Sequence, residues 1–257
     1  MEYRRLGQAG MKVSTVALGA WLTYGGHVED SAAADCIRAA VEQGVNFIDV
    51  ADAYARGGAE EVVGRVIKDY QRSDLVISSK LYWPMSDNVN DRGLSRKHIM
   101  ESVEKSLRRL DTDYLDIYFC HRYDPETPLE EVVRAMDDLV HQGKVLYWGT
   151  SVWSAAQLEA AVGTARQFNC YLPQVEQPRY NMLDRHIEGE IMATAARHGM
   201  GITVFSPLAQ GVLTGKYNDG VPEDSRAAVL DGWKDRMIME ADLARVRKLT
   251  EIAGDHG

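Results

Sequence analysis

The chain has 257 residues, of which 45% are hydrophobic and 26% are charged, a globular composition with enough length to bury one sizeable core. Its formal net charge of −9 argues against a nucleic-acid-binding protein, because such proteins present Lys- and Arg-rich faces to phosphates. The sequence contains neither a run of 18 uncharged apolar residues nor a signal-peptide pattern, so we expect a soluble, cytoplasmic protein without membrane insertion.

Seven short apolar runs recur along the chain, with starts about 30 residues apart, and each predicts a strand. The runs cover residues 13–20, 45–51, 75–81, 115–121, 145–151, 173–177 and 202–208. Helical periodicity fills the intervals, most clearly in residues 96–110 and 129–142. Gly44, Gly143 and Gly199 each follow a helical pattern, where a left-handed residue is wanted at the end of the helix.

Strands that alternate with helices predict a parallel sheet covered by helices, in either a barrel or an open doubly wound form. No GxGxxG motif follows the first strand, and seven units in 257 residues approach the eight of a (β/α)₈ TIM barrel. The barrel is therefore favoured, as a single domain over residues 1–257. After the seventh run, a long loop over 209–239 and one helical pattern from Leu243 to Ile252 are expected. The eighth strand and helix are absent, so we expect that the C-terminal part of the barrel is missing.

Polar side chains stand where the predicted strands end. In chain order they are Asp49 with Tyr54, then Lys80, His121, Ser151, Gln177 and Ser206. Functional side chains of a (β/α)₈ barrel cluster at these C-terminal strand ends. We therefore expect these residues to lie around one site.

Asp49, Tyr54, Lys80 and His121 form a set that could polarise a carbonyl group. The ammonium of Lys80 is expected to lower the phenol pKa from its reference value of about 10, so that Tyr54 serves as a general acid near neutral pH. Asp49 would pair with Lys80, and His121 would orient the carbonyl oxygen. Each residue alone is more often structural; only the set at successive strand ends indicates chemistry.

The set contains no group suited to attack a carbonyl carbon. The sequence has no G-x-S-x-G elbow and no metal-ligand cluster. Its cysteines, Cys36, Cys120 and Cys170, are odd in number and far apart, so we interpret them as reduced, small apolar side chains. Hydride from a nicotinamide cofactor fits best, because the protein then supplies only a proton and orientation.

Several motifs resemble the aldo-keto reductase superfamily in order and spacing. They are YRRLG, GMKVSTVALGAW, NFIDVADAY, ISSKLYW, YFCHR, YWGTSVWS and FSPLAQGVLTGKY. The segments GLSRKHIMESVEKSLRRLDTDYLDIY and HRYDPETPLEEVVRAM resemble especially the branch that holds voltage-gated potassium channel beta subunits and their bacterial reductase relatives. The resemblance runs from about residue 2 to the end of the chain.

The resemblance implies a (β/α)₈ barrel that binds NADPH across its C-terminal mouth. It also implies that Asp49, Tyr54, Lys80 and His121 are a catalytic tetrad with Tyr54 as proton donor. The residues that it assigns to the cofactor are Trp21, Asp49, Ser151, Gln177, Phe205, Ser206, Pro207, Leu208, Lys216 and Arg226. Lys216 and Arg226 match positions near the adenosine 2′-phosphate, which two permanent positive charges would suit.

Three positions depart from the channel beta subunits. His121 stands where those subunits generally carry asparagine, Val152 follows Ser151 where they carry arginine, and Phe205 replaces a tryptophan. Histidine restores the ordinary reductase tetrad, and the other two changes weaken contacts with the cofactor. The departures favour a reductase that turns over, rather than a subunit that holds its cofactor as a sensor.

The leading hypothesis is NADPH-dependent reduction of aldehyde or ketone carbonyls, including small or phosphorylated aldehydes. The alternative is a regulatory subunit that binds NADPH with little turnover and docks on a membrane channel; a tetramer is implied by the resemblance. Catabolic oxidation by the same chemistry also remains open. Tyr82, Trp83 and Trp153 suggest an aromatic wall around the substrate, although packing is the commoner role of such residues.

Overall fold

The computed structural model describes residues 1–26, 29–230 and 232–256. They form two compact units. The first comprises Met1–Gln177 and Glu190–Thr203, and the second comprises Pro178–Gly189 and Val204–Gly257.

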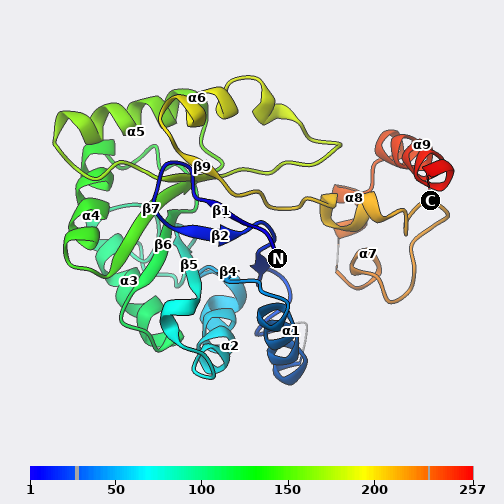
Figure 1. Ribbon diagram of the computed structural model, residues 1–257, viewed down its shortest axis with the longest axis horizontal. Helices are drawn as coiled ribbons and strands as arrows, with labels where there is room; N and C mark the ends of the chain where they lie inside the picture. Colours follow the sequence, from blue (N-terminus) through cyan, green and yellow to red (C-terminus); the bar gives the residue numbers. More distant parts are fainter. Residues whose placement is uncertain (27–28, 231, 257) are drawn as a thin grey trace. The chain divides into compact units, whose positions relative to one another are not determined.

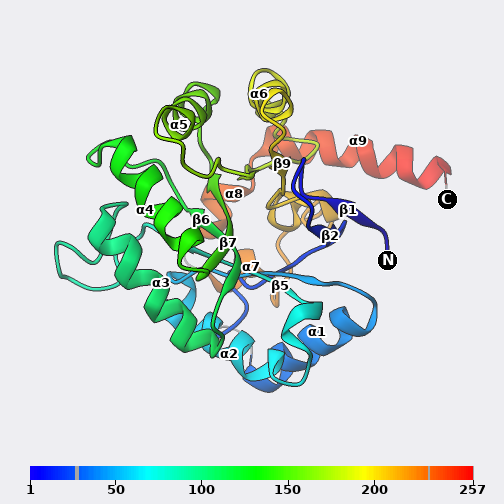
Figure 2. The same ribbon diagram turned by 60° about the vertical axis from the view of Figure 1, so that its left-hand side comes forward.

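The first unit is built on a curled sheet of seven parallel strands, in the order β3-β4-β5-β6-β7-β8-β9 (Figures 1 and 2). The strands are β3 (Leu18–Gly19), β4 (Phe47–Asp49), β5 (Val76–Leu81), β6 (Leu115–Cys120), β7 (Val145–Ser151), β8 (Val175–Gln177) and β9 (Gly201–Ile202). Strands consecutive in the chain are neighbours in the sheet, as in a (β/α)₈ barrel. The fold class predicted from the sequence is confirmed: no further strand follows β9 in the residues that the structure describes.

Helices connect the strands and cover the outer face of the sheet (Figure 2). They are α1 (Asp30–Glu42), α2 (Gly58–Ile67), α3 (Arg96–Leu110), α4 (Leu129–His141), α5 (Ala155–Gln167) and α6 (Ile191–Arg197). The predicted helices over 96–110 and 129–142 are confirmed as α3 and α4. The left-handed conformation predicted at the ends of α1, α4 and α6 is confirmed by φ values of 87°, 71° and 68° at Gly44, Gly143 and Gly199.

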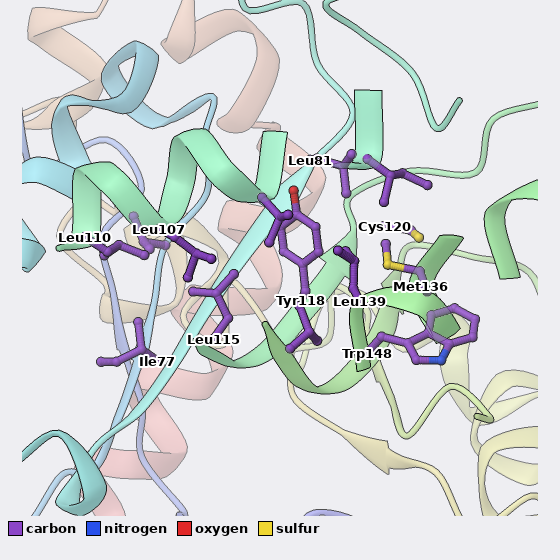
Figure 3. Close-up of a cluster of buried hydrophobic side chains, with 14 of the residues drawn as sticks. Ile77, Leu81, Leu107, Leu110, Leu115, Tyr118, Cys120, Met136, Leu139 and Trp148 are labelled. Atoms are coloured by element: carbon purple, nitrogen blue, oxygen red, sulfur yellow. The ribbon is translucent and has the colours of Figure 1, made fainter. Parts of the chain in front are cut away.

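The strands are buried on both faces, which explains why they read as apolar runs. On one side, Tyr118 and Cys120 of β6 pack with residues of α3 and α4, among them Leu107, Met136 and Leu139 (Figure 3). On the other side, Ile117 and Phe119 of β6 belong to a separate cluster with Phe47, Val76 and Val175. Alternate residues of one strand therefore serve two different cores.

A short N-terminal hairpin, β1 (Tyr3–Arg5) and β2 (Lys12–Ser14), lies against that second cluster. The prediction of one strand over residues 13–20 is therefore wrong in part, since β2 pairs with β1 and only β3 joins the sheet. At the end of β2, Ser14 N donates a hydrogen bond to the side chain of Asn46 at 2.7 Å. In the turn between β1 and β2, the backbone N–H of Gln8 donates a hydrogen bond to Gly199 O at 2.8 Å. This bond anchors the turn on the residues that follow α6.

The second unit has no strand among its described residues. It holds the short helices η3 (His186–Glu188), η4 (Ala209–Thr214), α7 (Arg226–Val229) and α8 (Trp233–Met237), and the longer α9 (Glu240–His256). The helix predicted from Leu243 to Ile252 is thus confirmed as α9. The unit has its own apolar cluster, formed by Ala209, Val212, Tyr217, Ala227, Leu243 and Val246.

Two sequence predictions about this part of the chain are corrected. The seventh strand, predicted over 202–208, ends at Ile202; beyond it, Phe205 forms only an isolated bridge with Arg179. Ser206 has a φ of 54°, and Pro207 lacks an N–H, so neither can extend a ladder. The predicted loop over 209–239 contains η4, α7 and α8, whose single turns are too short to produce a clear periodic pattern.

Candidate active site

Asp49 ends β4 and receives an ion pair from the neighbouring strand. Lys80 Nζ lies 2.6 Å from Asp49 Oδ2, and it also donates to Val50 O at 2.9 Å. The lysine side chain is fully buried, while the aspartate side chain is 16% exposed. A buried ammonium is tolerated only with such partners. The prediction that Asp49 is paired is confirmed.

Tyr54 lies in the turn after β4, at the start of the short helix η1 (Tyr54–Gly57). Its Oη is 3.2 Å from Lys80 Nζ, so the lysine bonds both the phenol and the carboxylate. The two residues after Tyr54, Ala55 and Arg56, have φ values of 50° and 51°, a left-handed conformation that few non-glycine residues adopt. Such a turn is typical of sites where the position of one side chain matters more than local stability.

His121 follows β6 directly, and its backbone N–H donates to Leu81 O at 3.0 Å, which continues the sheet by one residue. Its ring meets that of Tyr54 edge to face, with centroids 5.8 Å apart. The Nδ1 atom is buried without a hydrogen-bond partner among the described residues. The four residues of the predicted tetrad thus lie together at the C-terminal ends of consecutive strands.

Burial sets the protonation of the site. It raises the pKa of the Tyr54 phenol above its ordinary value, and the ammonium of Lys80 offsets only part of that rise. The sequence predicts the opposite direction, and that prediction is wrong, since desolvation of a phenolate outweighs one nearby cation here. Burial also opposes charge on Lys80, but the carboxylate of Asp49 prevails and raises the pKa of the lysine.

The imidazole of His121 is neutral. Burial, followed by the positive charges of Lys80 and Arg122, holds the pKa of His121 well below its ordinary value. At neutral pH the site therefore contains an ammonium, a protonated phenol and a neutral imidazole, which can donate hydrogen bonds to an uncharged oxygen.

Ser151 and Gln177, the last residues of β7 and β8, are buried beside the ion pair. Ser151 Oγ donates to Gln177 O at 2.9 Å, and Gln177 Nε2 donates to Asp49 Oδ1 at 3.1 Å. The two residues that the resemblance assigns to a cofactor carboxamide are thus joined to the tetrad by hydrogen bonds. The second hydrogen of Gln177 Nε2 and the side-chain oxygen Oε1 are left for another partner.

The other residues assigned to the cofactor are divided between the units. Trp21 lies in the first unit after β3 and is 40% exposed. Those of the second unit are Phe205, Ser206, Pro207, Leu208, Lys216 and Arg226. Lys216 Nζ lies 5.1 Å from the Tyr217 ring centroid, and neither Lys216 nor Arg226 forms an ion pair with a described residue.

The aromatic residues suggested as a wall behave differently from one another. Trp83 is 40% exposed, and its ring lies 6.2 Å from that of His121 and 5.1 Å from that of Tyr82. Trp153, in contrast, is buried and packs edge to face on Tyr123 at 4.9 Å. Trp83 thus lies beside His121 with Tyr82 next to it, whereas Trp153 is part of the buried core.

Sequence reasoning missed the two serines of β5, Ser78 and Ser79. Ser78 Oγ donates to Asp49 Oδ1 at 2.6 Å, whereas Ser79 Oγ donates to the buried carboxylate of Glu60 in α2. The available signal is the pair of hydroxyls inside an otherwise buried strand, because buried polar groups need partners. The ISSKL run thus presents one serine to each face of the sheet.

Another acid, the fully buried Asp52, lies three residues after Asp49. Asp52 Oδ2 accepts a hydrogen bond from Ser102 of α3 at 3.0 Å, and Oδ1 has no partner among the described residues. Burial, with a smaller contribution from the charge of Glu60, raises the pKa of Asp52 to about 7. Arg109 bonds Glu60 at 2.6 Å and not Asp52. Asp52 is thus a carboxyl group without a cation of its own.

Metal binding and membrane insertion are two other classes of function that the described residues bear on. Within the described ranges, no group of three or more His, Cys, Asp or Glu side chains could hold a metal ion. None of the helices in the described part of the chain has both the length and the apolar character needed to cross a membrane.

A parallel (β/α) barrel sheet with Asp, Tyr, Lys and His at successive strand ends is the architecture of a carbonyl-reducing oxidoreductase family. The chain belongs to the aldo/keto reductase family, whose model matches residues 15–257. It is also similar to two plant proteins named "Probable voltage-gated potassium channel subunit beta". The protein from Arabidopsis thaliana is 47% identical and that from Oryza sativa subsp. japonica is 45% identical; each match covers 100% of this chain and 80% of the relative.

Proposed function

We propose that the protein is an NADPH-dependent reductase of aldehyde or ketone carbonyls, with Tyr54 as the general acid. The observation that carries this proposal is the position of Lys80 Nζ, 2.6 Å from Asp49 and 3.2 Å from the Tyr54 hydroxyl, inside the sheet of an aldo/keto reductase family member. We further propose that both units form one cytoplasmic reductase domain.

Proton transfer at Tyr54 Oη is the step that the tetrad supports. The phenol keeps its proton until the carbonyl oxygen gains negative charge, because burial holds its pKa above the ordinary value. When the proton leaves, the ammonium of Lys80 stabilises the phenolate, and Asp49 keeps that ammonium charged. Neutral His121, beside the Tyr54 ring, would bond the same oxygen and orient the carbonyl.

The donor set fits a nicotinamide cofactor, which would supply the hydride when bound. Buried Gln177 retains amide groups for a carboxamide, and Ser151 lies beside it. Lys216 and Arg226 carry charges that no described acid neutralises by an ion pair, as a phosphate group requires. Asp49, Trp21 and residues 205–208 complete the proposed set.

The test is the decrease in NADPH absorbance with a panel of aldehydes that includes methylglyoxal, a nitrobenzaldehyde and glyceraldehyde 3-phosphate. Tyr54→Phe is expected to lower kcat at least about 100-fold, the usual contribution of a general acid, while NADPH still binds. Tyr70→Phe is the matched control, because Tyr70 packs at the end of α2, outside the tetrad. Undiminished turnover by Tyr54→Phe would disprove the assignment of the proton donor.

The names of the two plant relatives favour a second candidate, a channel-associated regulatory subunit that retains NADPH with little turnover. It predicts a stable tetramer, a cofactor that survives gel filtration and negligible NADPH oxidation with every aldehyde. Rapid turnover together with easy exchange of the cofactor would favour the reductase. The histidine at position 121 supports the reductase, because it supplies the fourth member of the tetrad.

A further inference from the structure

Arg122 is a cation beside the tetrad, and its positive charge already helps to lower the pKa of His121. It follows His121 at the end of β6, is half-buried and donates from Nη1 to the backbone carbonyl of His121. Its Cζ lies over the Trp83 ring, 5.5 Å from the centroid. The rings of Trp83, His121 and Tyr54 follow one another at 6.2 Å and 5.8 Å, so the guanidinium belongs to the same cluster as the proton donor.

No carboxylate neutralises this guanidinium. Among the described residues Arg122 forms no ion pair, whereas two other half-buried arginines do: Arg72 lies 2.6 Å from Asp116 and Arg109 lies 2.6 Å from Glu60. The acid whose charge acts on Arg122 is Glu176, and burial raises the pKa of Glu176 to about 7. The carboxyl of Glu176 is instead bonded by Thr150 Oγ1 and Trp153 N.

An unpaired, partly desolvated guanidinium is costly unless a partner arrives, and its planar donors match carboxylate and phosphate oxygens. We propose that Arg122 selects carbonyl substrates that carry an anionic group, either a carboxylate or a phosphate. Trp83 would hold the guanidinium in place and cover the apolar part of the substrate. This inference rests on the proposed reductase function and names the substrate class of the same site.

The test compares isosteric substrates. 4-Carboxybenzaldehyde is set against 4-carbamoylbenzaldehyde, and glyceraldehyde 3-phosphate against glyceraldehyde, so that the two sources of negative charge are separated. The wild type is expected to favour the charged member of at least one pair by about tenfold in kcat/KM, and less so in high salt. The pair with the larger ratio identifies carboxylate or phosphate as the preferred group.

Variants of Arg122 test whether this residue causes the preference for the charged substrate. Arg122→Met is expected to bring the charged-to-neutral ratio close to one, and Arg122→Lys to retain part of it, because lysine keeps the charge but loses the two-pronged donor geometry. Arg134→Met is the matched control: Arg134 also stacks on an aromatic ring, Phe168, at 4.3 Å, but lies on α4. It should leave the ratio unchanged. A ratio near one in the wild type, or an undiminished ratio in Arg122→Met, overturns the inference.

A binding measurement keeps the inference testable whether or not the reductase proposal holds. Benzoate and benzamide are titrated into the protein with NADP⁺, with tryptophan fluorescence as the readout. Benzoate is expected to bind the wild type about tenfold more tightly than Arg122→Met, and benzamide to bind both alike. Equal benzoate affinities would overturn the role of Arg122. Absence of carbonyl reduction with every substrate would instead count against the proposed function alone.

Discussion

Asp49 is the last residue of β4 and Asp52 follows it three residues later, yet the two carboxyl groups have opposite surroundings. Asp49 meets a buried ammonium at 2.6 Å and two further donors, Ser78 and Gln177. Asp52 meets one hydroxyl, from Ser102, and burial raises its pKa to about 7. Burial without a cation favours the neutral form of an acid, whereas a dedicated cation at hydrogen-bond distance provides an ion pair that can act on a third group.

Lys80→Met is expected to produce the largest effect. It removes the cation from Asp49 and leaves a poorly exposed carboxylate unpaired, so the free energy of unfolding should fall by about 3 kcal/mol and turnover should be lost. Urea unfolding followed by circular dichroism measures the loss. The double variant Asp49→Asn/Lys80→Met should be more stable than Lys80→Met, because neither charge is then stranded. If the double variant is less stable than Lys80→Met, the loss of stability in Lys80→Met does not come from an unpaired Asp49 carboxylate.

Asp52→Asn tests the other half of the comparison through pH. The folded protein holds the Asp52 proton up to about pH 7, but the ordinary pKa is 3.8, so the folded state binds more protons between these values. Stability therefore falls as pH rises through this range, by roughly 1.4 kcal/mol for each unit of pKa shift at most. The asparagine in Asp52→Asn cannot ionise. The stability of this variant should therefore not fall with pH on account of residue 52, and above pH 7 the variant should be more stable than the wild type.

Urea unfolding at pH 5, 6, 7 and 8 checks this expectation. Glu176, whose pKa burial also raises to about 7, will leave a remaining slope in Asp52→Asn. Glu176→Gln is therefore the companion variant. Asp52→Asn and Glu176→Gln should each remove the part of the pH dependence of stability that comes from the substituted acid. Parallel stability profiles for wild type and Asp52→Asn would show that Asp52 is ionised in the folded protein.

The smallest expected effect separates the two serine hydroxyls. Ser78→Ala removes a charge-assisted bond to Asp49 and should cost about 2 kcal/mol, whereas Ser102→Ala removes a bond to a protonated acid and should cost about 1 kcal/mol. Unfolding at pH 6 compares the pair. An equal or larger cost for Ser102→Ala would mean that the two carboxyl groups do not differ in charge.

The features that the sequence predicts well are those set by local pattern. Strands buried on both faces must be apolar throughout, so β5, β6 and β7 are visible as runs, and helices such as α3 show one apolar face. The tetrad follows from the same pattern, because the C-terminal ends of consecutive parallel strands meet at one edge.

The features that the sequence does not predict depend on residues that are distant in the chain. Tyr54 has a raised pKa because its phenol is desolvated in the folded protein, which no local pattern reveals. The guanidinium of Arg122 is significant only because Trp83, 39 positions earlier, lies beneath it. The conformation of Ser206 is likewise not visible in the sequence, because its positive φ is unusual for serine.

The N-terminal hairpin has a consequence for the order in which the first unit can form. A Cβ atom on Gly7 would lie 2.3 Å from Gly199 O, so this turn closes tightly on backbone from the far end of the unit. During synthesis residues 3–14 are made before residues 199–201, so the turn can close on that backbone only after residue 201 has been made. Closure of this turn therefore requires the segment that forms β9, the last strand of the sheet among the described residues.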